Sequence, residues 1–471
     1  MSNSTTKKKL ATPLDDADEI CRLSAAELSR AFASRALSPV EAAQATLARA
    51  EAIQPRFNAF TEIDHDGAVA AARRSEARWR AGAPLSPIDG APTTIKDIVW
   101  VEGKTIGSGS KASEPIAPTR DAPSVARLRR AGAVFLGLTT TPEFGWKAVT
   151  DSPRTGVTSN PWNDALTPGG SSGGAAVAAA TGAGALHLGT DGGGSIRIPA
   201  TFAGVVGLKP TFGQVAAYPA SAFGTLAHVG PLARSAEDAK LMLDAMAGRD
   251  LADWNQPPVQ YARRDLRPLD FRGLKIGYWR TPPCGALDAE VGGACDAAVK
   301  RLAAAGAEVE PLTLPDAGLL ELFNTLWLAS ATRRVRSVPE PRRSLIDPNL
   351  IEAVKRFEGD SAVDYVDASV RRVEFASWME ALFERFDLVV SPAVTVPPFD
   401  KGRDFPVGSG MKIWTEWAGF SFPVNLSQQP ACVVPCARTR DERPIGLQFI
   451  AARAADDRVL EAAAAYRALA A

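Results

Sequence analysis

The sequence lacks the features that would place it among membrane-spanning, disulfide-rich or nucleic-acid-binding proteins. No stretch approaches the roughly 20 strongly apolar residues of a membrane-spanning helix, and the most apolar segment, Gly173–Gly189, is mostly alanine and glycine. Only five cysteines are spread over 471 residues, which favours a reducing compartment over a disulfide framework. Lysine plus arginine and aspartate plus glutamate both number 53, so the net charge is zero and polyanionic partners are disfavoured.

What remains is the composition of a water-soluble globular protein. With 46% hydrophobic and 23% charged residues the chain can bury a sizeable core, either as one large domain or as about three average ones. Residues 1–20 are polar and lack the apolar centre of a secretory signal, so we expect a flexible tail there and a cytoplasmic protein. The folded part is then expected to cover residues 21–471.

Helix and strand signals alternate along the chain. Capping boxes at Ser24–Glu27 and Ser38–Glu41 predict helices that begin near Ala25 and Pro39. Further helices are expected at Gly67–Ala81, Ser124–Ala131, after Ser172, after Ser235, and at Asp288–Ala304, Ala362–Phe386 and Asp456–Ala470. Short apolar runs predict strands at Thr93–Trp100, Val134–Thr139, Leu186–Thr190, Val205–Lys209, Leu274–Tyr278, Val309–Leu312, Leu388–Ser391, Cys432–Cys436 and Ile445–Ile450.

This alternation predicts an α/β fold with a mixed β-sheet core that helices cover on both faces. The Pro-rich connection Gly248–Pro268 could mark a domain boundary, but strand signals recur beyond it, so a single large domain is expected. Cys432 and Cys436 form a C-x3-C pair inside an apolar run without a nearby histidine, which favours a buried strand over a metal site.

Two glycine-rich segments, Thr167–Gly174 and Gly189–Arg197, require a chemical reason because glycine is costly in backbone entropy. A phosphate-binding loop fails, since Gly103–Thr105 lacks the first glycine of G-x-x-x-x-G-K-[ST] and the G-x-G-x-x-G pattern is broken at Arg197. Gly169–Gly173 formally matches the nucleophile elbow G-x-S-x-G, with Ser171 as the nucleophile. The downstream histidines for that arrangement are His187, inside an apolar run, and His228.

The third possibility combines the serines with Lys96, which lies inside the apolar run Thr93–Val99. Burial disfavours the charged form of lysine, so its pKa should fall and the amine could act as a base. The alternative is a buried ion pair with Asp97. Alternation along a strand points residues 96 and 97 to opposite faces, which weakens that alternative.

Together these segments resemble the amidase signature family. Ser171 follows Lys96 by 75 residues and Ser195 follows Ser171 by 24, as in the family's Ser-cisSer-Lys triad. The core motifs of the family are similar to Gly169–Gly174, Asp191–Arg197 and Gly207–Thr211. Further similar segments extend the resemblance over nearly the whole chain: Asn58–Phe60, Gly90–Lys96, Pro142–Phe144, Val229–Pro231 and Ile445–Gln448.

The resemblance implies an acyl-enzyme mechanism within a catalytic core at about residues 90–235, without metal or cofactor. Ser195 would be the acylated nucleophile, and Ser171, after a cis bond from Gly170, would relay the proton to neutral Lys96. The implied oxyanion hole consists of the backbone N–H groups of Gly192, Gly193, Gly194 and Ser195. The residues implied to orient this site are Gly170, Ser172, Thr190, Asp191 and Arg197.

The resemblance defines the bond type better than the substrate. The branch that amidates Glu-tRNA with partner chains is expected to carry an aspartate before its Ile-Gly-Pro element, and Thr225–Pro231 has none. A stand-alone hydrolase, monomeric or homodimeric and without nucleic acid or membrane as partner, is therefore expected. An amidotransferase A-type subunit that needs partner chains, and a catalytically silent ligand-binding homologue, stay open as alternatives.

The expected substrates are small and neutral aryl or alkyl amides, with anilides, esters and carbamates as further possibilities. Aromatic residues at helical spacing belong more often to a core than to a pocket. Those that we expect to line the pocket are Phe144, Trp146, Tyr218, Phe223, Trp327, Trp414, Trp417 and Phe420.

Overall fold

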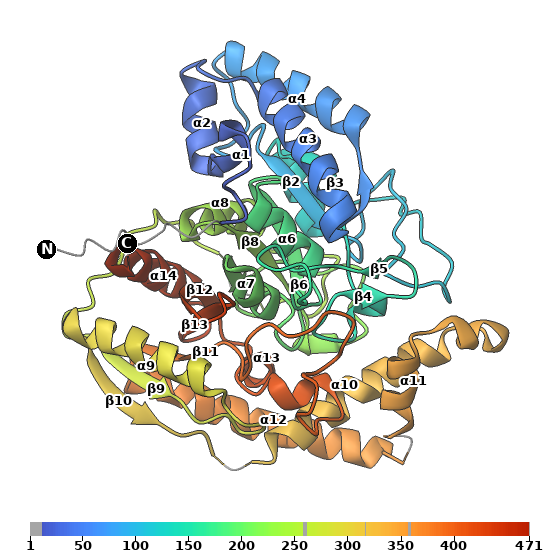
Figure 1. The fold of residues 1–471 in the computed structure, drawn as a ribbon, viewed down its shortest axis with the longest axis vertical. Helices are drawn as coiled ribbons and strands as arrows, with labels where there is room; N and C mark the ends of the chain where they lie inside the picture. The colour runs from blue at the N-terminus through green and yellow to red at the C-terminus, as the bar shows by residue number, and fades with distance from the viewer. Residues whose placement is uncertain (1–11, 258–260, 316, 357–358, 471) are drawn as a thin grey trace, which may run out of the picture.

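One mixed β-sheet runs through the molecule (Figure 1). A computed structural model describes residues 12–257, 261–315, 317–356 and 359–470, and within them eleven strands follow the order β1-β3-β2-β6-β8-β7-β12-β13-β11-β9-β10. Their bounds are β1 (Phe60–Ile63), β2 (Pro92–Lys96), β3 (Val134–Thr139), β6 (Leu186–Asp191), β7 (Val206–Lys209), β8 (His228–Ala233), β9 (Lys275–Trp279), β10 (Glu308–Leu312), β11 (Leu388–Pro392), β12 (Ala431–Arg438) and β13 (Pro444–Ile450). Strands β4 (Asp151–Ser152) and β5 (Gly156–Val157) pair separately.

The sheet contains two parallel parts separated by an antiparallel part, and its edge strand β1 is antiparallel to β3. Strand β2 pairs in parallel with β3 and β6, and β9 pairs in parallel with β10 and β11, whereas the pairs from β6 through β8, β7, β12 and β13 to β11 are antiparallel. Strands from both sides of the connection Gly248–Pro268 belong to this sheet, which confirms the single large α/β domain.

Helices cover both faces of the sheet through two main hydrophobic clusters. One cluster contains residues of α2, α5, α8, α9 and α14, and the other contains residues of α7, α10, α12 and α13. In Figure 1 helices α2–α4 lie at the top of the molecule and α10–α12 at the bottom. The helices are α1 (Glu19–Arg22), α2 (Ala25–Ala33), α3 (Pro39–Phe57), α4 (His65–Arg80), α5 (Pro123–Arg130), α6 (Gly173–Thr181), α7 (Arg197–Ala203), α8 (Ala236–Met246), α9 (Ala289–Ala304), α10 (Leu319–Arg336), α11 (Pro348–Lys355), α12 (Ala362–Ala381), α13 (Phe422–Ser427) and α14 (Asp456–Ala470).

Local sequence signals account for many of these bounds. Both predicted capping boxes form: the Ser24 and Ser38 side chains accept from the backbone N–H groups of Glu27 and Glu41, whose carboxylates accept in return from the cap N–H groups. Cys432 and Cys436 lie on β12, as predicted. The helix predicted over Ala362–Phe386 ends earlier, at Ala381, where a 3₁₀ turn follows.

Several elements were not predicted. Strand β8 contains Gly230 and Pro231, residues with poor strand propensity, and it forms because it is paired on both sides by β6 and β7. Helices α10 and α11 were not predicted either, although Asp347 and Pro348 at the start of α11 are a typical N-cap and first helical residue. The predicted tail over residues 1–20 falls partly on residues 1–11, outside the described part; residues 12–20 include a turn in which Asp16 pairs with Arg49 of α3 at 2.7 Å.

Within the described ranges, none of the helices has the length and apolarity needed to cross a bilayer.

A buried ion cluster fixes the segment after β3. The Nζ of Lys147 lies 2.7 Å from Asp151 Oδ1, 3.0 Å from Asp347 Oδ2 and 2.9 Å from Asp404 Oδ1. Burial acts to lower the pKa of Lys147, but the three carboxylates outweigh it and raise that pKa above its ordinary value. The Trp146 Nε1–H also donates to Asp347 at 3.1 Å. The cluster therefore ties residues 146–151 to the start of α11 and to the loop before α13.

We expect Lys147→Met to destabilise the fold strongly, because it leaves three carboxylates without a counter-charge. Removing one partner from a buried ion cluster costs about 3–5 kcal/mol. Urea unfolding at pH 7 measures the loss, which should shrink at acidic pH as the carboxylates take up protons. The control is Arg280→Met, which breaks the more exposed pair with Asp296 and should cost about 1 kcal/mol or less. Equal losses in both variants would contradict this account.

Candidate active site

Strand alternation places Lys96 at the centre of the site. Ile95 of β2 belongs to the hydrophobic cluster on one face of the sheet, so the next side chain, Lys96, points to the opposite face and is completely buried. There its Nζ lies 2.6 Å from Ser171 Oγ, 3.0 Å from Ser172 Oγ and 3.0 Å from Thr190 Oγ1. Ser171 and Ser172 directly precede α6, and Thr190 lies near the end of β6.

These three hydroxyls fit a neutral amine. Burial lowers the pKa of Lys96 to about 7, although Asp191 partly opposes this shift. Ser172 Oγ already donates to the Thr190 carbonyl oxygen at 3.2 Å, so it must accept from Lys96. A neutral amine has two N–H donors and one lone pair. If the amine donates to Ser172 and Thr190, its lone pair remains to accept a hydrogen bond from the Ser171 hydroxyl. Lys96 is thereby arranged as a base toward Ser171.

Asp97 does not neutralise Lys96. Its Oδ1 accepts from the Gly107 backbone N–H at 2.8 Å, and burial raises its pKa to about 6. Asp97 directly follows the last residue of β2, and among the described residues no ion pair joins its side chain to Lys96. The alternative of a buried Lys96–Asp97 pair is therefore not supported.

Ser195 lies on the tight loop between β6 and α7. Asp191, the last residue of β6, shapes this loop: its carboxylate accepts from the backbone N–H groups of Gly194 at 2.8 Å and Ile196 at 3.2 Å. Gly194 has φ +123°, a conformation that side chains disfavour, and an added Cβ would lie 2.6 Å from Ile198 and Ser421 atoms. The glycine is therefore required for the loop to close.

Arg197 holds the Asp191 carboxylate in place. Its Nε and Nη2 donate to Oδ2 and Oδ1 of Asp191, both at 3.0 Å, and both residues are completely buried. Burial alone would raise the pKa of Asp191, but Arg197 lowers it below its ordinary value. The guanidinium also donates to Asn425 Oδ1 at 2.6 Å and Gln448 Oε1 at 2.7 Å. The hydrogen bond to Gln448 holds the segment Ile445–Gln448 beside the site.

The loop presents fewer free N–H groups than the sequence suggested. In the part of the chain that the structure describes, the N–H groups of Gly192, Gly193 and Ser195 have no hydrogen-bond acceptor. The Gly194 N–H, in contrast, is bound to the Asp191 carboxylate. Gly194 therefore shapes the loop and does not contribute a free donor, which corrects the expectation of four donors.

Ser171 and Ser195 open into one cavity of about 400 Å³. The bond between Gly170 and Ser171 is cis, and a Cβ on Gly170 would lie 2.6 Å from the Val149 backbone. The Ser172 N–H donates to the Ser195 carbonyl oxygen at 3.1 Å, which joins the two loops. Among the described residues no hydrogen bond links the Ser171 and Ser195 hydroxyls. Hydrogen bonds between catalytic groups often shorten or form only when substrate is bound.

Half of the expected aromatic residues line this cavity. Phe144, Tyr218, Phe223 and Trp327 lie on its wall, and the Phe223 ring stacks on Trp327 with centroids 3.7 Å apart. The other four are outside the wall, as core residues commonly are. Trp146 donates a hydrogen bond to Asp347, and Trp414 packs against Gly193. The ring centroids of Trp417 and Phe202 lie 5.9 Å apart, and those of Phe420 and Trp279 lie 5.0 Å apart.

Sequence reasoning missed other wall residues. Trp100 lies four residues after Lys96 and contacts the edge of Tyr218 at 5.9 Å, a position that the nearness of Trp100 to β2 could have suggested. Arg333 and Arg334 at the end of α10 also line the cavity. They had no signal, because α10 itself was not predicted.

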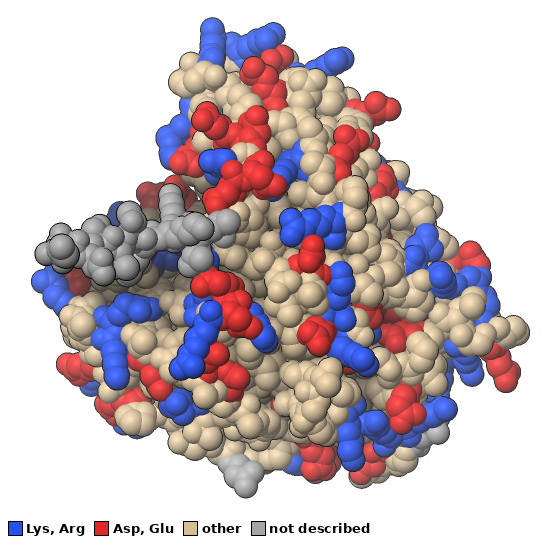
Figure 2. Space-filling view, in the orientation of Figure 1, with Lys and Arg blue, Asp and Glu red and all other residues tan. Residues whose placement is uncertain are grey.

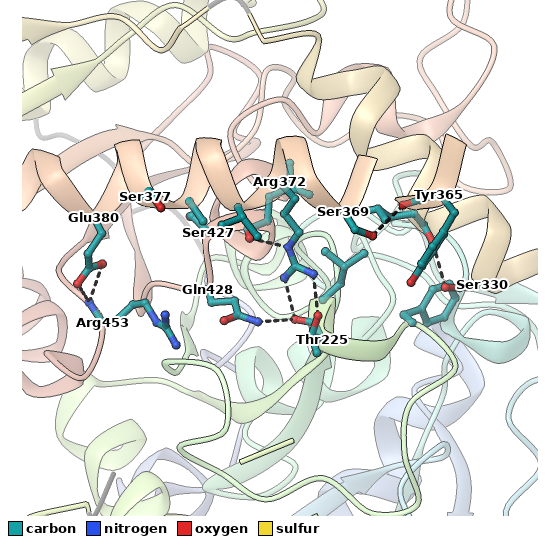
Figure 3. A pocket seen from close by; sticks show the side chains of 16 residues that line it. Thr225, Ser330, Tyr365, Ser369, Arg372, Ser377, Glu380, Ser427, Gln428 and Arg453 are labelled. Carbon is teal, nitrogen blue, oxygen red and sulfur yellow. Dashed lines mark hydrogen bonds between the residues drawn. The ribbon is translucent and has the colours of Figure 1, made fainter. Parts of the chain in front are cut away.

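A second cavity of about 480 Å³ is lined by residues of α12, among them Arg372, and by Thr225 (Figure 3). Figure 3 shows Arg372 of α12 reaching to Thr225, where it donates to Oγ1 at 2.7 Å and to the carbonyl oxygen at 3.0 Å. It also donates to the Leu426 carbonyl oxygen at 2.8 Å. This cavity reaches neither Ser171 nor Ser195, so its described contacts support the wall of the first one.

The histidines give no support to a Ser171–His elbow. His187 Nδ1 lies 2.8 Å from Thr94 Oγ1, and burial lowers the pKa of His187 to about 3. His228 Nδ1 lies 2.8 Å from the Leu226 carbonyl oxygen. Neither histidine hydrogen-bonds to Ser171 in the described ranges, whereas Lys96 does.

Comparisons with known proteins agree with this geometry. The Amidase family model matches residues 41–460. An acylamidase of Rhodococcus erythropolis is 34% identical over 464 residues, which cover 95% of each chain. The A-type component of the glutamyl-tRNA(Gln) amidotransferase from Geobacter metallireducens is 33% identical, over 95% of this chain and 97% of that protein. The crystal structure of a bacterial aryl acylamidase of the amidase signature family is similar with a TM-score of 0.85 and 27% identity, covering 95% of this chain and 96% of that one.

The fold and the family match together define the class of this protein. The chain belongs to the amidase signature family, as its motifs had indicated. It is an amide hydrolase, and enzymes of this family act on small amide substrates.

We expect Lys96→Met to raise stability at pH 7, because methionine fills a similar volume without an amine to neutralise. Lysine has a pKa near 10.4 when unfolded but about 7 here, so the unfolded state binds more protons between these pH values. The wild-type free energy of unfolding should therefore rise with pH across that window, whereas the variant lacks this slope. The gain at pH 7 should be of the order of 2 kcal/mol after the lost hydrogen bonds are counted.

Urea unfolding at pH 7 and pH 9.5 measures this difference, with the exposed Lys275→Met as control. A Lys96→Met variant less stable than the wild type at pH 7 would show that the amine is buried in its charged form.

Proposed function

We propose that this chain is a stand-alone amide hydrolase in which Ser195 is the nucleophile, Ser171 the proton relay and Lys96 the base. The observation that carries this proposal is the buried amine of Lys96, which lies 2.6 Å from Ser171 Oγ and has a pKa lowered to about 7. A base with a pKa near the working pH is effective in proton transfer. No step in the proposal requires a metal or cofactor.

In the acylation step Ser195 Oγ attacks the substrate carbonyl carbon while its proton passes to Ser171 Oγ. Ser171 in turn gives its own proton to the lone pair of Lys96. The carbonyl oxygen becomes an oxyanion, for which the free N–H groups of Gly192, Gly193 and Ser195 are the available donors. The proton then returns through Ser171 to the nitrogen of the leaving amine, the C–N bond breaks, and an acyl-enzyme on Ser195 remains.

Water completes the cycle by the same relay. Its proton passes through Ser171 to Lys96 as its oxygen attacks the acyl carbon, and the proton then returns to Ser195 as the ester bond breaks. The products are a carboxylic acid and an amine. Asp191 and Arg197 hold the loop that carries Ser195 throughout, while Ser172 and Thr190 keep Lys96 oriented.

The proposed substrates are aryl or alkyl amides of modest size, including anilides. A cavity of about 400 Å³ with aromatic walls suits such molecules, and the similarity to an acylamidase and an aryl acylamidase supports this class. Esters and carbamates are further proposed substrates, because they form the same kind of acyl-enzyme.

Amidotransferase A-type components are similar at nearly the same identity, so the need for partner chains requires a direct test. The segment Thr225–Pro231 lacks the aspartate expected in that branch, which favours a chain that is active alone. Release of amine from an anilide by the purified chain supports the stand-alone hydrolase. Activity only after addition of amidotransferase partner chains would contradict it.

A serine-directed sulfonyl fluoride should label Ser195 of the wild type. Mass spectrometry should find one adduct on the peptide that contains Ser195, no adduct in Ser195→Ala, and reduced labelling in Ser171→Ala because the relay is interrupted. Ser337→Ala, on the exposed end of α10, is the matched control and should be labelled like the wild type. An adduct on Ser171 in the wild type would favour the elbow arrangement instead.

The pH dependence of kcat/KM with a neutral anilide should follow the deprotonation of Lys96. Because the reaction needs the neutral amine, kcat/KM should rise with pH through an apparent pKa near 7 and then level off. Lys96→Ala should lower the rate by a factor of roughly 10²–10⁴, as for the loss of a general base, and should remove this rise. A profile that is flat between pH 6 and 8 would show that Lys96 is not the group that titrates.

A further inference from the structure

The charged side chains on the wall of the active-site cavity carry one sign. Among the described residues that line it, Arg333 and Arg334 are the charged ones, and no aspartate or glutamate lies on the wall. The side chain of Arg120 is a third cation nearby, 4.0 Å above the ring of the wall residue Tyr218. A chain with zero net charge thus has a locally positive substrate cavity.

Arg334 is partly buried in the wall, whereas Arg333 is exposed. Its guanidinium is 4.2 Å from the centre of the Phe144 ring, and burial lowers its pKa. Within the described ranges neither Arg333 nor Arg334 forms an ion pair or a side-chain hydrogen bond. The nearest acid, Glu143, is occupied because it accepts from Ser110 Oγ at 2.6 Å and from the Asp347 N–H at 2.6 Å.

Arg334 is partly buried and has no ion-pair partner among the described residues, whereas arginines withdrawn from water are normally paired. Arg372 shows the contrast: it also lacks an acidic partner, but carbonyl and hydroxyl oxygens of Thr225 and Leu426 satisfy its N–H groups. The N–H groups of Arg334 have no such acceptors in the described structure, and they form the planar fork that matches a carboxylate.

The helix that carries Arg334 also contacts the oxyanion loop. Trp327 of α10 packs against Gly192, where a Cβ would lie 2.8 Å from its ring. Arg334 follows Trp327 by seven residues, two turns on the same face of the helix, which corresponds to about 10 Å along its axis. On the opposite wall Phe144 precedes Gly145, where a Cβ would lie 3.4 Å from Ser171 Oγ. The arginines and the catalytic serines therefore share one cavity, with Phe144 and Gly145 between Arg334 and Ser171.

We propose that the preferred substrates are amides with a carboxylate or similar anion, which Arg334 binds with the help of Arg333 in the same cavity as the scissile carbonyl. This inference rests on the proposed function, and it refines the expectation of a neutral substrate. That expectation came from the net charge of the whole chain, which says little about one cavity: Figure 2 shows acidic and basic side chains mixed over the visible surface.

The test uses matched pairs of anilides. Monoanilides of linear dicarboxylic acids of increasing length are compared with methyl-terminated anilides of the same length, and acetylated ω-amino acids with the corresponding acetylated alkylamines. The first series places the anion on the acyl side and the second on the amine side. We expect at least a tenfold preference in kcat/KM for the anionic member of one series at the matching length, reduced by added salt.

Arg334→Gln should abolish this preference, lowering the anionic-to-neutral ratio of kcat/KM by about 10- to 100-fold, as for lost hydrogen bonds to a charged group. Arg334→Lys should restore only part of the preference, because an ammonium lacks the planar fork. Arg336→Gln, the same charge change two residues further on the exposed side of α10, is the control and should leave the ratio unchanged.

Several outcomes would overturn the inference while leaving the proposed function intact. These are equal kcat/KM for the anionic and neutral members in both series, or a ratio that Arg334→Gln and Arg336→Gln change alike. If no anilide is hydrolysed, the proposed function fails, and calorimetry with Ser195→Ala decides the inference alone. Binding of the anionic anilide that Arg334→Gln weakens at least tenfold supports it, and binding indifferent to the anion or to Arg334 refutes it.

Discussion

The site depends on the burial of one amine without an acid beside it. Lys96 extends from β2 into the interior, and its pKa falls to about 7 because water no longer solvates its charged form. Three hydroxyls surround it, enough to satisfy a neutral amine but too weak to keep a proton on it. The packing of α6 against the sheet supplies two of these hydroxyls, so the chemistry of Lys96 is a consequence of the fold.

Asp191 could have prevented this, because it is the nearby acid that favours the charged form of Lys96. Its carboxylate is instead used by Arg197, by Asn425 and by the N–H groups of the loop. The same bonds that shape the Ser195 loop therefore also keep Asp191 away from Lys96. Two neighbouring buried groups thus shift in opposite ways: pairing with Arg197 favours the charged form of Asp191, whereas burial favours the neutral form of Lys96.

Local patterns could predict the parts of this arrangement that local physics decides. The capping boxes at Ser24 and Ser38, the strand Val134–Thr139 and the helix Asp456–Ala470 have the bounds or starts that their sequences indicate. Motif spacing also indicated that Lys96, Ser171 and the Ser195 loop would meet. Strand β8 could not be predicted, because its glycine and proline are tolerated only through its two neighbours.

The residues that line the cavity were even harder to predict from the sequence. Whether an aromatic ring such as that of Trp327 or Trp414 faces the cavity depends on which side of the Gly192–Gly193 loop it packs, and composition does not reveal this. The number of free backbone N–H groups on the loop was overestimated for a similar reason. The Gly194 N–H donates to Asp191, and only the folded loop brings these two groups together.

The structure also separates the chemistry from the selectivity along the chain. Lys96, Ser171 and Ser195 lie within one segment whose strands and helices pack at the centre of the sheet, and small changes there would disturb the buried amine. The arginines of the wall come from α10, more than a hundred residues later, on a helix that contacts the loop of Gly192 and Gly193 through Phe323 and Trp327. A change at the far end of α10 can therefore alter which substrate fits without altering the pKa of Lys96.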